Sequence, residues 1–163
     1  IRHIGVTGVQ TCALPILWLD YPSFAEEVQI VKATTTDHTP TVNPVVNAQE
    51  IKEFQDLVRR VPVADNVIEY AVKVVKATRP KTSEAKIVKD YLSYGAGPRA
   101  SQFMILGAKT RAALSGRPTP EIADICAIAP SVLRHRIVAN FNAEAENLST
   151  TDIIAELMKE IKS

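Results

Sequence analysis

Apolar residues recur every three or four positions along most of this chain, which is the spacing that gathers them on one face of an α-helix. The clearest case is the stretch 65–78, with apolar residues at Val67, Tyr70, Ala71, Val74 and Val75. The same spacing predicts further helices over 23–35, 47–61, 86–94, 98–115, 119–129 and from 149 onward. The strict alternation of a half-buried strand is almost absent. The sequence therefore predicts a mainly α fold, a helical bundle with at most a short strand at its start.

Polar side chains at the predicted helix starts can cap free backbone amides. Ser23–Glu26 and Asn47–Glu50 match the capping-box pattern, in which two side chains satisfy amides reciprocally. Asp65 and Ser149 are expected to cap the helices that follow them. Pro120 is expected at the first position of its helix, where its missing N–H costs nothing. Helices are expected to end at or just before Pro62, Gly95, Gly116 and Pro130.

The start of the chain differs from the rest of the pattern. Residues 1–16 contain VTGVQTCALPI, which resembles the conceptual translation of a sequencing adapter, so we expect them to be an assembly artefact without ordered structure. Leu17–Leu19 reads as a short buried strand for which the residues downstream offer no partner. Residues 17–36 are therefore interpreted as the end of a preceding domain, and residues 37–163 as a helical domain.

Charge and composition argue against several classes of function. The chain has 19 basic and 18 acidic residues, and leaving out residues 1–16, which contain Arg2 and no acid, gives 18 of each. A neutral chain gives no reason to expect nucleic acid or a membrane surface as partner. No apolar run approaches the roughly 18 residues of a membrane span. Cys12 and Cys126 lack the spacing of a disulfide framework or a metal site, so a reducing, cytoplasmic compartment is expected.

The sequence lacks the motifs of most catalytic sites. No GxxxxGK[ST] loop that could cradle phosphates is present, and no metal site is expected. The histidines are His3, His38 and His135, and none has the pattern of a catalytic triad or of a cysteine–histidine pair. His135 lies between two arginines, which are expected to disfavour its protonation.

One motif stands out, GAGPRAS at 95–101. Pro98 favours the first helical position, which places Arg99 in the first turn of its helix. The amino end of a helix disfavours cations, typically by about 0.3–1 kcal/mol, and attracts anions. Arg99 can therefore serve a bound phosphate, with Gly95 and Gly97 permitting a close backbone approach. It can equally pair with a neighbouring acid or stay solvated, and the local pattern leaves these interpretations open.

Several motifs, taken in order, resemble the C-terminal region of MoxR-family AAA+ ATPases. They are VPVAD (61–65), ATRP (77–80), GAGPRAS (95–101), VLRHRI (132–137) and NAEAE (142–146). The opening LDYPSFAEEVQIV resembles the end of that family's ATPase core, so the resemblance covers residues 17–163. It implies that the bundle is an AAA+ lid and that Arg99 is the sensor 2 arginine, which reaches the γ-phosphate of ATP held by the core. Gly95, Gly97 and Pro98 would then lie beside the nucleotide.

The resemblance also implies an activity and partners for the whole protein. A MoxR-type chaperone or remodelling ATPase would use ATP and Mg²⁺ and assemble its own N-terminal core with neighbouring subunits in a ring, expected to be a hexamer. It would work with von Willebrand factor A-domain proteins. The Walker A and Walker B residues, the sensor 1 residue and the arginine finger are missing from these 163 residues. The chain alone is therefore expected to bind no cofactor and to hydrolyse no ATP.

Two further questions stay open at this point. The cluster Arg134, His135 and Arg136 can contact a neighbouring subunit or nucleotide, or it can be a solvated basic face beside Glu144 or Glu146. Alternatively, the chain is a stand-alone helical module that binds nucleic acid or another protein. A nucleic-acid-binding module would use a set of arginines, namely Arg111, Arg117, Arg134 and Arg136.

Overall fold

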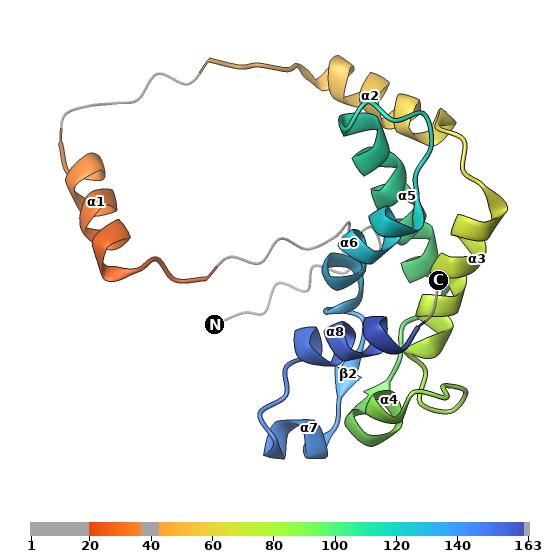
Figure 1. The fold of residues 1–163 in the computed structure, drawn as a ribbon. Helices are drawn as coiled ribbons and strands as arrows, with labels where there is room; N and C mark the ends of the chain where they lie inside the picture. The colour runs from red at the N-terminus through yellow and green to blue at the C-terminus, as the bar shows by residue number, and fades with distance from the viewer. Residues whose placement is uncertain (1–19, 37–42, 162–163) are drawn as a thin grey trace, which may run out of the picture.

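The computed structural model describes residues 20–36 and 43–161. The expected artefact at 1–16 and the expected strand Leu17–Leu19 lie outside the described residues. Within the described ranges the chain forms helices connected by short loops, with one small antiparallel sheet (Figure 1). The elements are α1 (Phe24–Thr34), α2 (Ala48–Arg60), α3 (Asp65–Ala77), α4 (Lys86–Tyr91), β1 (Leu92–Tyr94), α5 (Pro98–Leu114), α6 (Ile122–Leu133), β2 (Val138–Ala139), α7 (Phe141–Ala145) and α8 (Thr150–Glu160). The prediction of a mainly α fold is confirmed.

The core lies where α5 packs along α3 and α6, and α8 packs against α6 and α4. The apolar stripe predicted on α3 is buried as a whole. The buried positions of α5 are mostly alanines, which let α3 and α6 approach its backbone closely. The largest fully buried side chains are Met104, Ile125, Leu133, Ile153, Ile154 and Leu157.

Most of the predicted caps are confirmed. Ser23 with Glu26, and Asn47 with Glu50, form complete capping boxes at the starts of α1 and α2. Ser149 caps α8 and shares a capping box with its third helical residue. Gly116 follows α5 with a φ of +68°, the left-handed conformation that glycine adopts without a steric penalty.

Several details of the predicted helix boundaries are wrong. Asp65 is the first residue of α3 rather than its cap, and no side chain caps that helix. Pro120 precedes α6, because Glu121 and Asp124 form a capping box that starts the helix at Ile122. Pro130 lies inside α6 instead of ending it. The missing N–H of a proline removes one hydrogen bond from a helix, but continuing the helix buries an apolar face that includes Ala129, Val132 and Leu133.

The small sheet is a feature that the periodicity did not predict. The helix expected over 86–94 ends at Tyr91, and β1 then pairs antiparallel with β2, with Leu92 opposite Ala139 and Tyr94 opposite Val138. Strands of three and two residues are too short to show an alternating pattern. β1 leads directly into the turn before α5.

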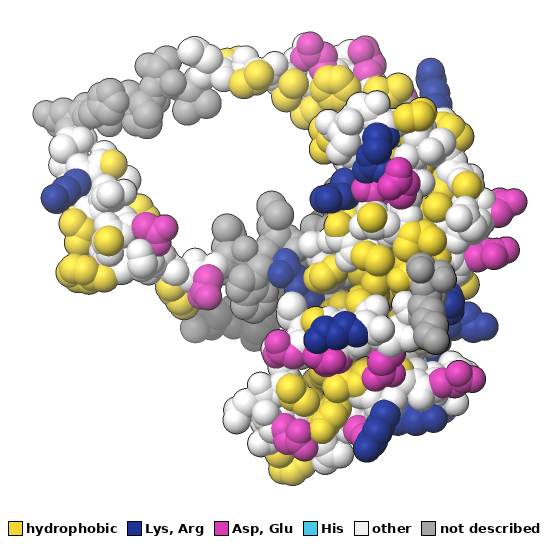
Figure 2. Space-filling model, viewed as in Figure 1, with side chains coloured by type: hydrophobic (Ala, Val, Ile, Leu, Met, Phe, Trp, Pro, Cys, Tyr) yellow, Lys and Arg dark blue, Asp and Glu magenta, His cyan; other side chains and the backbone are white. Residues whose placement is uncertain are grey.

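α1 and α2 differ from the rest because neither carries a buried residue. α1 lies apart from the bundle, whereas α2 packs on α5, where Lys109 donates a hydrogen bond to the carbonyl of Arg59 at 3.2 Å (Figure 1). Apolar side chains gather on both helices (Figure 2). The exposed ones include Phe24, Ile30 and Val31 on α1 and Ile51, Phe54 and Leu57 on α2. Among the described residues, no helix is both long and apolar enough to span a membrane.

Candidate functional site

The predicted anion site is the amino end of α5. Gly97 occupies the N-cap position with extended backbone, Pro98 is the first helical residue, and Arg99 is the second. The first turn contains no acidic residue. Arg99 is exposed, so the structure does not bury its guanidinium in the interior of the bundle. The geometry therefore presents a cation at the exposed amino end of a helix, a position that attracts anions.

Two residues at the end of α3 hold the turn that leads into α5. The backbone N–H of Ala96 donates to Thr78 Oγ1 at 2.9 Å, and Arg79 Nε donates to the carbonyl of Ala96 at 3.1 Å. Thr78 is fully buried, and its hydroxyl donates in turn to the carbonyl of Val75 at 2.7 Å. Both backbone groups of Ala96 are therefore fixed by the two residues that directly follow α3. No local sequence pattern predicts these roles of Thr78 and Arg79, because both residues are far from Ala96 in the sequence.

The two glycines of the motif have different environments. A Cβ on Gly95 would lie 2.3 Å from the carbonyl oxygen of Thr78 and 2.6 Å from the Cα of Arg79, both backbone atoms. A Cβ on Gly97 would meet nothing within 4 Å. The expected close approach is thus an internal packing contact at Gly95. At Gly97 no part of the described chain makes such an approach, and a role beside nucleotide stays a prediction.

These environments make the two glycines a matched pair for mutation. Gly95→Ala is expected to destabilise the fold by about 2 kcal/mol, because two backbone segments must move apart to admit the methyl group. Gly97→Ala is expected to leave stability nearly unchanged, since its surroundings are open. Urea denaturation of both variants measures the difference. Equal stabilities would contradict the packing described for the turn.

Arg111 and Arg117 pair with a buried carboxylate while their own side chains reach the surface. Arg117 makes a two-pronged contact with the carboxylate of Asp124, at 2.8 and 2.6 Å, and Arg111 Nε lies 3.1 Å from the same group. Asp124 is only 2% exposed. The hydrogen bond from Arg117 is the largest cause that lowers the pKa of Asp124 to about 2. Two of the four arginines expected to serve a nucleic-acid-binding module are therefore structural, which weakens that alternative.

The basic cluster at the end of α6 is partly buried. Arg136 lies over the ring of Phe103, 5.0 Å from its centroid, and Nη1 donates to the carbonyl of Val132 at 2.5 Å. The same nitrogen contacts Nε2 of His135. Glu146, one of the two acids expected beside the cluster, accepts a hydrogen bond from the hydroxyl of Tyr91 at 2.8 Å. Arg136 is therefore partly buried, which differs from the interpretation as a solvated face, and the role of the cluster stays a prediction.

His135 is affected by this burial. Desolvation lowers the pKa of His135, and the positive charges of Arg136 and Arg134 lower it further. The pKa of His135 is therefore shifted in the predicted direction, but burial is a larger cause of the shift than the two arginines. The neutral imidazole is the favoured form in the folded chain.

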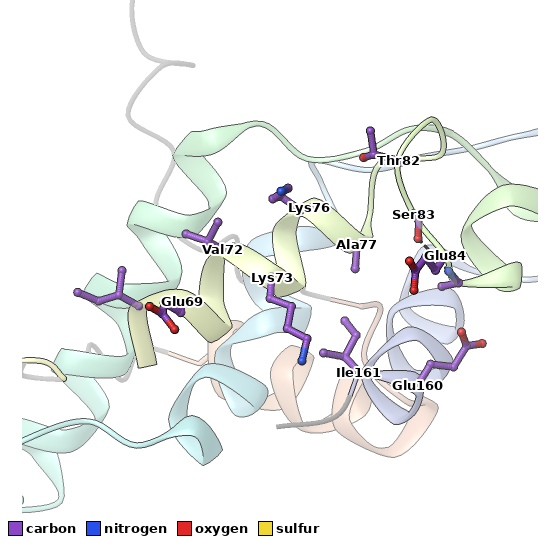
Figure 3. Close-up of a pocket in the computed structure, with 12 residues that line it drawn as sticks. Glu69, Val72, Lys73, Lys76, Ala77, Thr82, Ser83, Glu84, Glu160 and Ile161 are labelled. Carbon is purple, nitrogen blue, oxygen red and sulfur yellow. Dashed lines mark hydrogen bonds between the residues drawn. The ribbon is translucent and has the colours of Figure 1, made fainter. Parts of the chain in front are cut away.

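An open groove of about 760 Å³ lies between α3, the loop at 82–85 and the end of α8 (Figure 3). Its walls combine apolar residues with charges of both signs, among them Lys73, Lys76, Glu84 and Glu160. None of its lining residues belongs to α5 or to the turn before it. In the part of the chain that the structure describes, no cluster of three or more histidine, cysteine or acidic side chains could hold a metal ion.

Comparison with known proteins gives consistent matches. A family model for the AAA lid domain matches residues 84–157. The chain is 30% identical over 142 residues to the chaperone MoxR1 of Mycobacterium tuberculosis, covering 86% of this chain and 37% of that protein. It is 29% identical over 147 residues to the uncharacterized protein YeaC of Bacillus subtilis, covering 90% of this chain and 43% of YeaC.

A solved structure agrees with these matches. The crystal structure of a putative ATPase from Cytophaga hutchinsonii superposes with a TM-score of 0.77 at 27% identity, covering 88% of this chain and 44% of that one. The chain thus spans between 37% and 44% of the length of these relatives.

Proposed function

This chain carries an AAA lid domain at residues 84–157 and is homologous to a MoxR chaperone and to a putative ATPase, and from this premise we propose that it senses the γ-phosphate of ATP through Arg99. The observation that supports this proposal is the exposed guanidinium at the amino end of α5, in a first turn without acidic residues. The amino end of a helix attracts anions, so an arginine there is well placed to contact a phosphate.

The chemistry of Arg99 suits a phosphate group. A guanidinium is always charged and can donate two parallel hydrogen bonds to phosphate oxygens, which fixes direction as well as distance. Hydrolysis and phosphate release would remove the acceptor, so the lid could change its angle with the state of the nucleotide. Arginine and helix amides fit phosphate and do not fit Mg²⁺, which prefers oxygen ligands. We therefore propose that ATP and Mg²⁺ are held by an AAA+ core and that this lid contributes Arg99.

Membership among AAA+ proteins suggests an oligomeric assembly. We propose a hexameric ring in the cytoplasm that remodels client proteins as a chaperone, with von Willebrand factor A-domain proteins as partners. The exposed apolar residues of α1 and α2 support a contact with an ATPase core, because apolar patches of this kind mark interaction surfaces. The proposed assembly of lid, core and ring neighbours is called the assembled ATPase below.

The 163-residue chain by itself is expected to show no ATP hydrolysis above buffer, because its sequence has no phosphate-cradling loop. A phosphate-release assay on the purified chain measures this. Turnover that is abolished by a substitution within the chain would contradict the proposal that the catalytic machinery lies in a separate core.

A further inference from the structure

The helix that carries Arg99 is braced at a second place, by the residues that follow α6. Phe103 lies on α5 four residues after Arg99, so the two side chains share one face of the helix. Long helical side chains lean toward the amino end, so the Phe103 ring covers the turn from which Arg99 projects. Phe103 is partly buried against the core on one side. The guanidinium of Arg136 covers its ring at 5.0 Å.

The position of Arg136 is fixed from α6. Its Nη1 donates to the carbonyl of Val132 at 2.5 Å, and its backbone N–H donates to the carbonyl of Leu133 at 2.8 Å. Nη1 also contacts His135 Nε2. An arginine can only donate, so Nε2 is the acceptor and the neutral imidazole carries its proton on Nδ1. That atom is buried without a hydrogen-bond partner among the described residues.

The Arg136 guanidinium thus contacts the carbonyl of Val132, the ring of His135 and the ring of Phe103. These contacts connect the carboxyl end of α6 with the early part of α5.

We propose that Arg136 is a positioning residue for Arg99, acting through the Phe103 ring to fix the first turns of α5 against the carboxyl end of α6. This inference rests on the proposed function, because it assigns Arg136 to the same γ-phosphate contact. It gives the basic cluster a role within its own subunit. A direct contact of Arg136 with nucleotide or with a neighbouring subunit is the competing outcome of the test.

The test is a double-mutant cycle in the assembled ATPase. Arg136→Met removes the charge and keeps much of the length of the side chain. It is expected to lower kcat on the order of tenfold, because misplacing a catalytic group costs up to about 100-fold. The KM for ATP is expected to change less than kcat, since Arg99 contacts only the γ-phosphate and the proposed core holds the rest of the nucleotide. Combined with Arg99→Ala, the same substitution is expected to cause no further loss, because its target is already gone. Lys89→Met, an exposed charge loss on α4, serves as the control.

Each other outcome overturns the inference. Wild-type kcat in Arg136→Met would show that Arg136 positions nothing. Losses that multiply in the double variant would show that Arg136 acts independently, on nucleotide or on a neighbouring subunit. Wild-type turnover of Arg99→Ala alone would remove the proposed function, and the inference with it, and that single variant identifies this case separately.

A second measurement covers the possibility that Arg136→Met does not fold. Phe103→Leu removes the ring and keeps an apolar side chain at the same position. In the purified chain, nitrogen-15 relaxation of the Arg99 side chain is expected to show greater mobility in Phe103→Leu than in the unmodified chain, while the melting curve stays cooperative. Unchanged mobility of Arg99 would refute the brace without any assay of nucleotide turnover.

Discussion

Replacing Arg99 by alanine is expected to lower ATP turnover by the assembled ATPase about 100-fold. Removing one fixed hydrogen-bond donor that stabilises the charge developing in a transition state typically has an effect of this size. The fold should tolerate the change, because Arg99 is exposed and substitutions at such positions usually alter stability by less than about 0.5 kcal/mol. Arg99→Lys should recover only part of the activity, since an ammonium cannot make the two-pronged contact. Steady-state kinetics on the three proteins measure these effects.

The control for this prediction is Lys89→Ala, which removes an exposed positive charge from α4. Turnover of that variant should match the unmodified protein. If Arg99→Ala also retained full turnover, the assignment of Arg99 as the sensor would be wrong. If both variants lost activity equally, the effect would reflect the overall charge of the lid and not one contact.

The second large effect is expected on stability, from Asp124. Asp124→Ala should destabilise the fold by about 3 kcal/mol. This value is at the lower end of the range for breaking a buried ion pair, because the two arginines that would lose their partner reach solvent. Removal of the carboxylate also deletes the capping-box contact to the backbone N–H of Glu121, at 2.9 Å. Glu156→Ala, which breaks an exposed ion pair with Lys159, should cause no measurable change. Urea denaturation compares the two variants.

The same pair should make stability depend on pH in a defined window. The folded pKa of Asp124, about 2, lies below its ordinary value of 3.8, so the unfolded chain binds the proton more readily. The stabilisation is therefore complete above pH 3.8 and is lost as the pH falls toward 2. Asp124→Ala should lack this part of the pH dependence. Parallel curves for the two proteins across the window would show that the pair does not contribute.

The features that the sequence predicted correctly depend on local interactions. The capping box that begins at Ser23, the left-handed Gly116 and the placement of Arg99 in a first turn each involve residues within a few positions of one another. The buried stripe of α3 follows from periodicity alone. These features can be predicted from the sequence because the residues that form each of them lie within or next to a single helix.

The features that were missed depend on contacts between distant segments. Thr78 meets Ala96, Leu92 meets Ala139, and no local pattern marks either pair. α6 continues through Pro130 because its last turn buries an apolar face. The stabilisation from that burial outweighs the tendency of proline to end a helix. Arg136 was singled out by charge, but its contact with Phe103 became visible only with α5 and α6 in place.

A structure of the assembled ATPase with a non-hydrolysable ATP analogue tests the central claim most directly. The Arg99 guanidinium is expected to lie at hydrogen-bond distance from γ-phosphate oxygens, about 2.7–2.9 Å. An ADP complex should lack this contact and show a different lid angle. A guanidinium turned toward a carboxylate of its own lid in the ATP-analogue complex, with the γ-phosphate bound by other groups, would contradict the account.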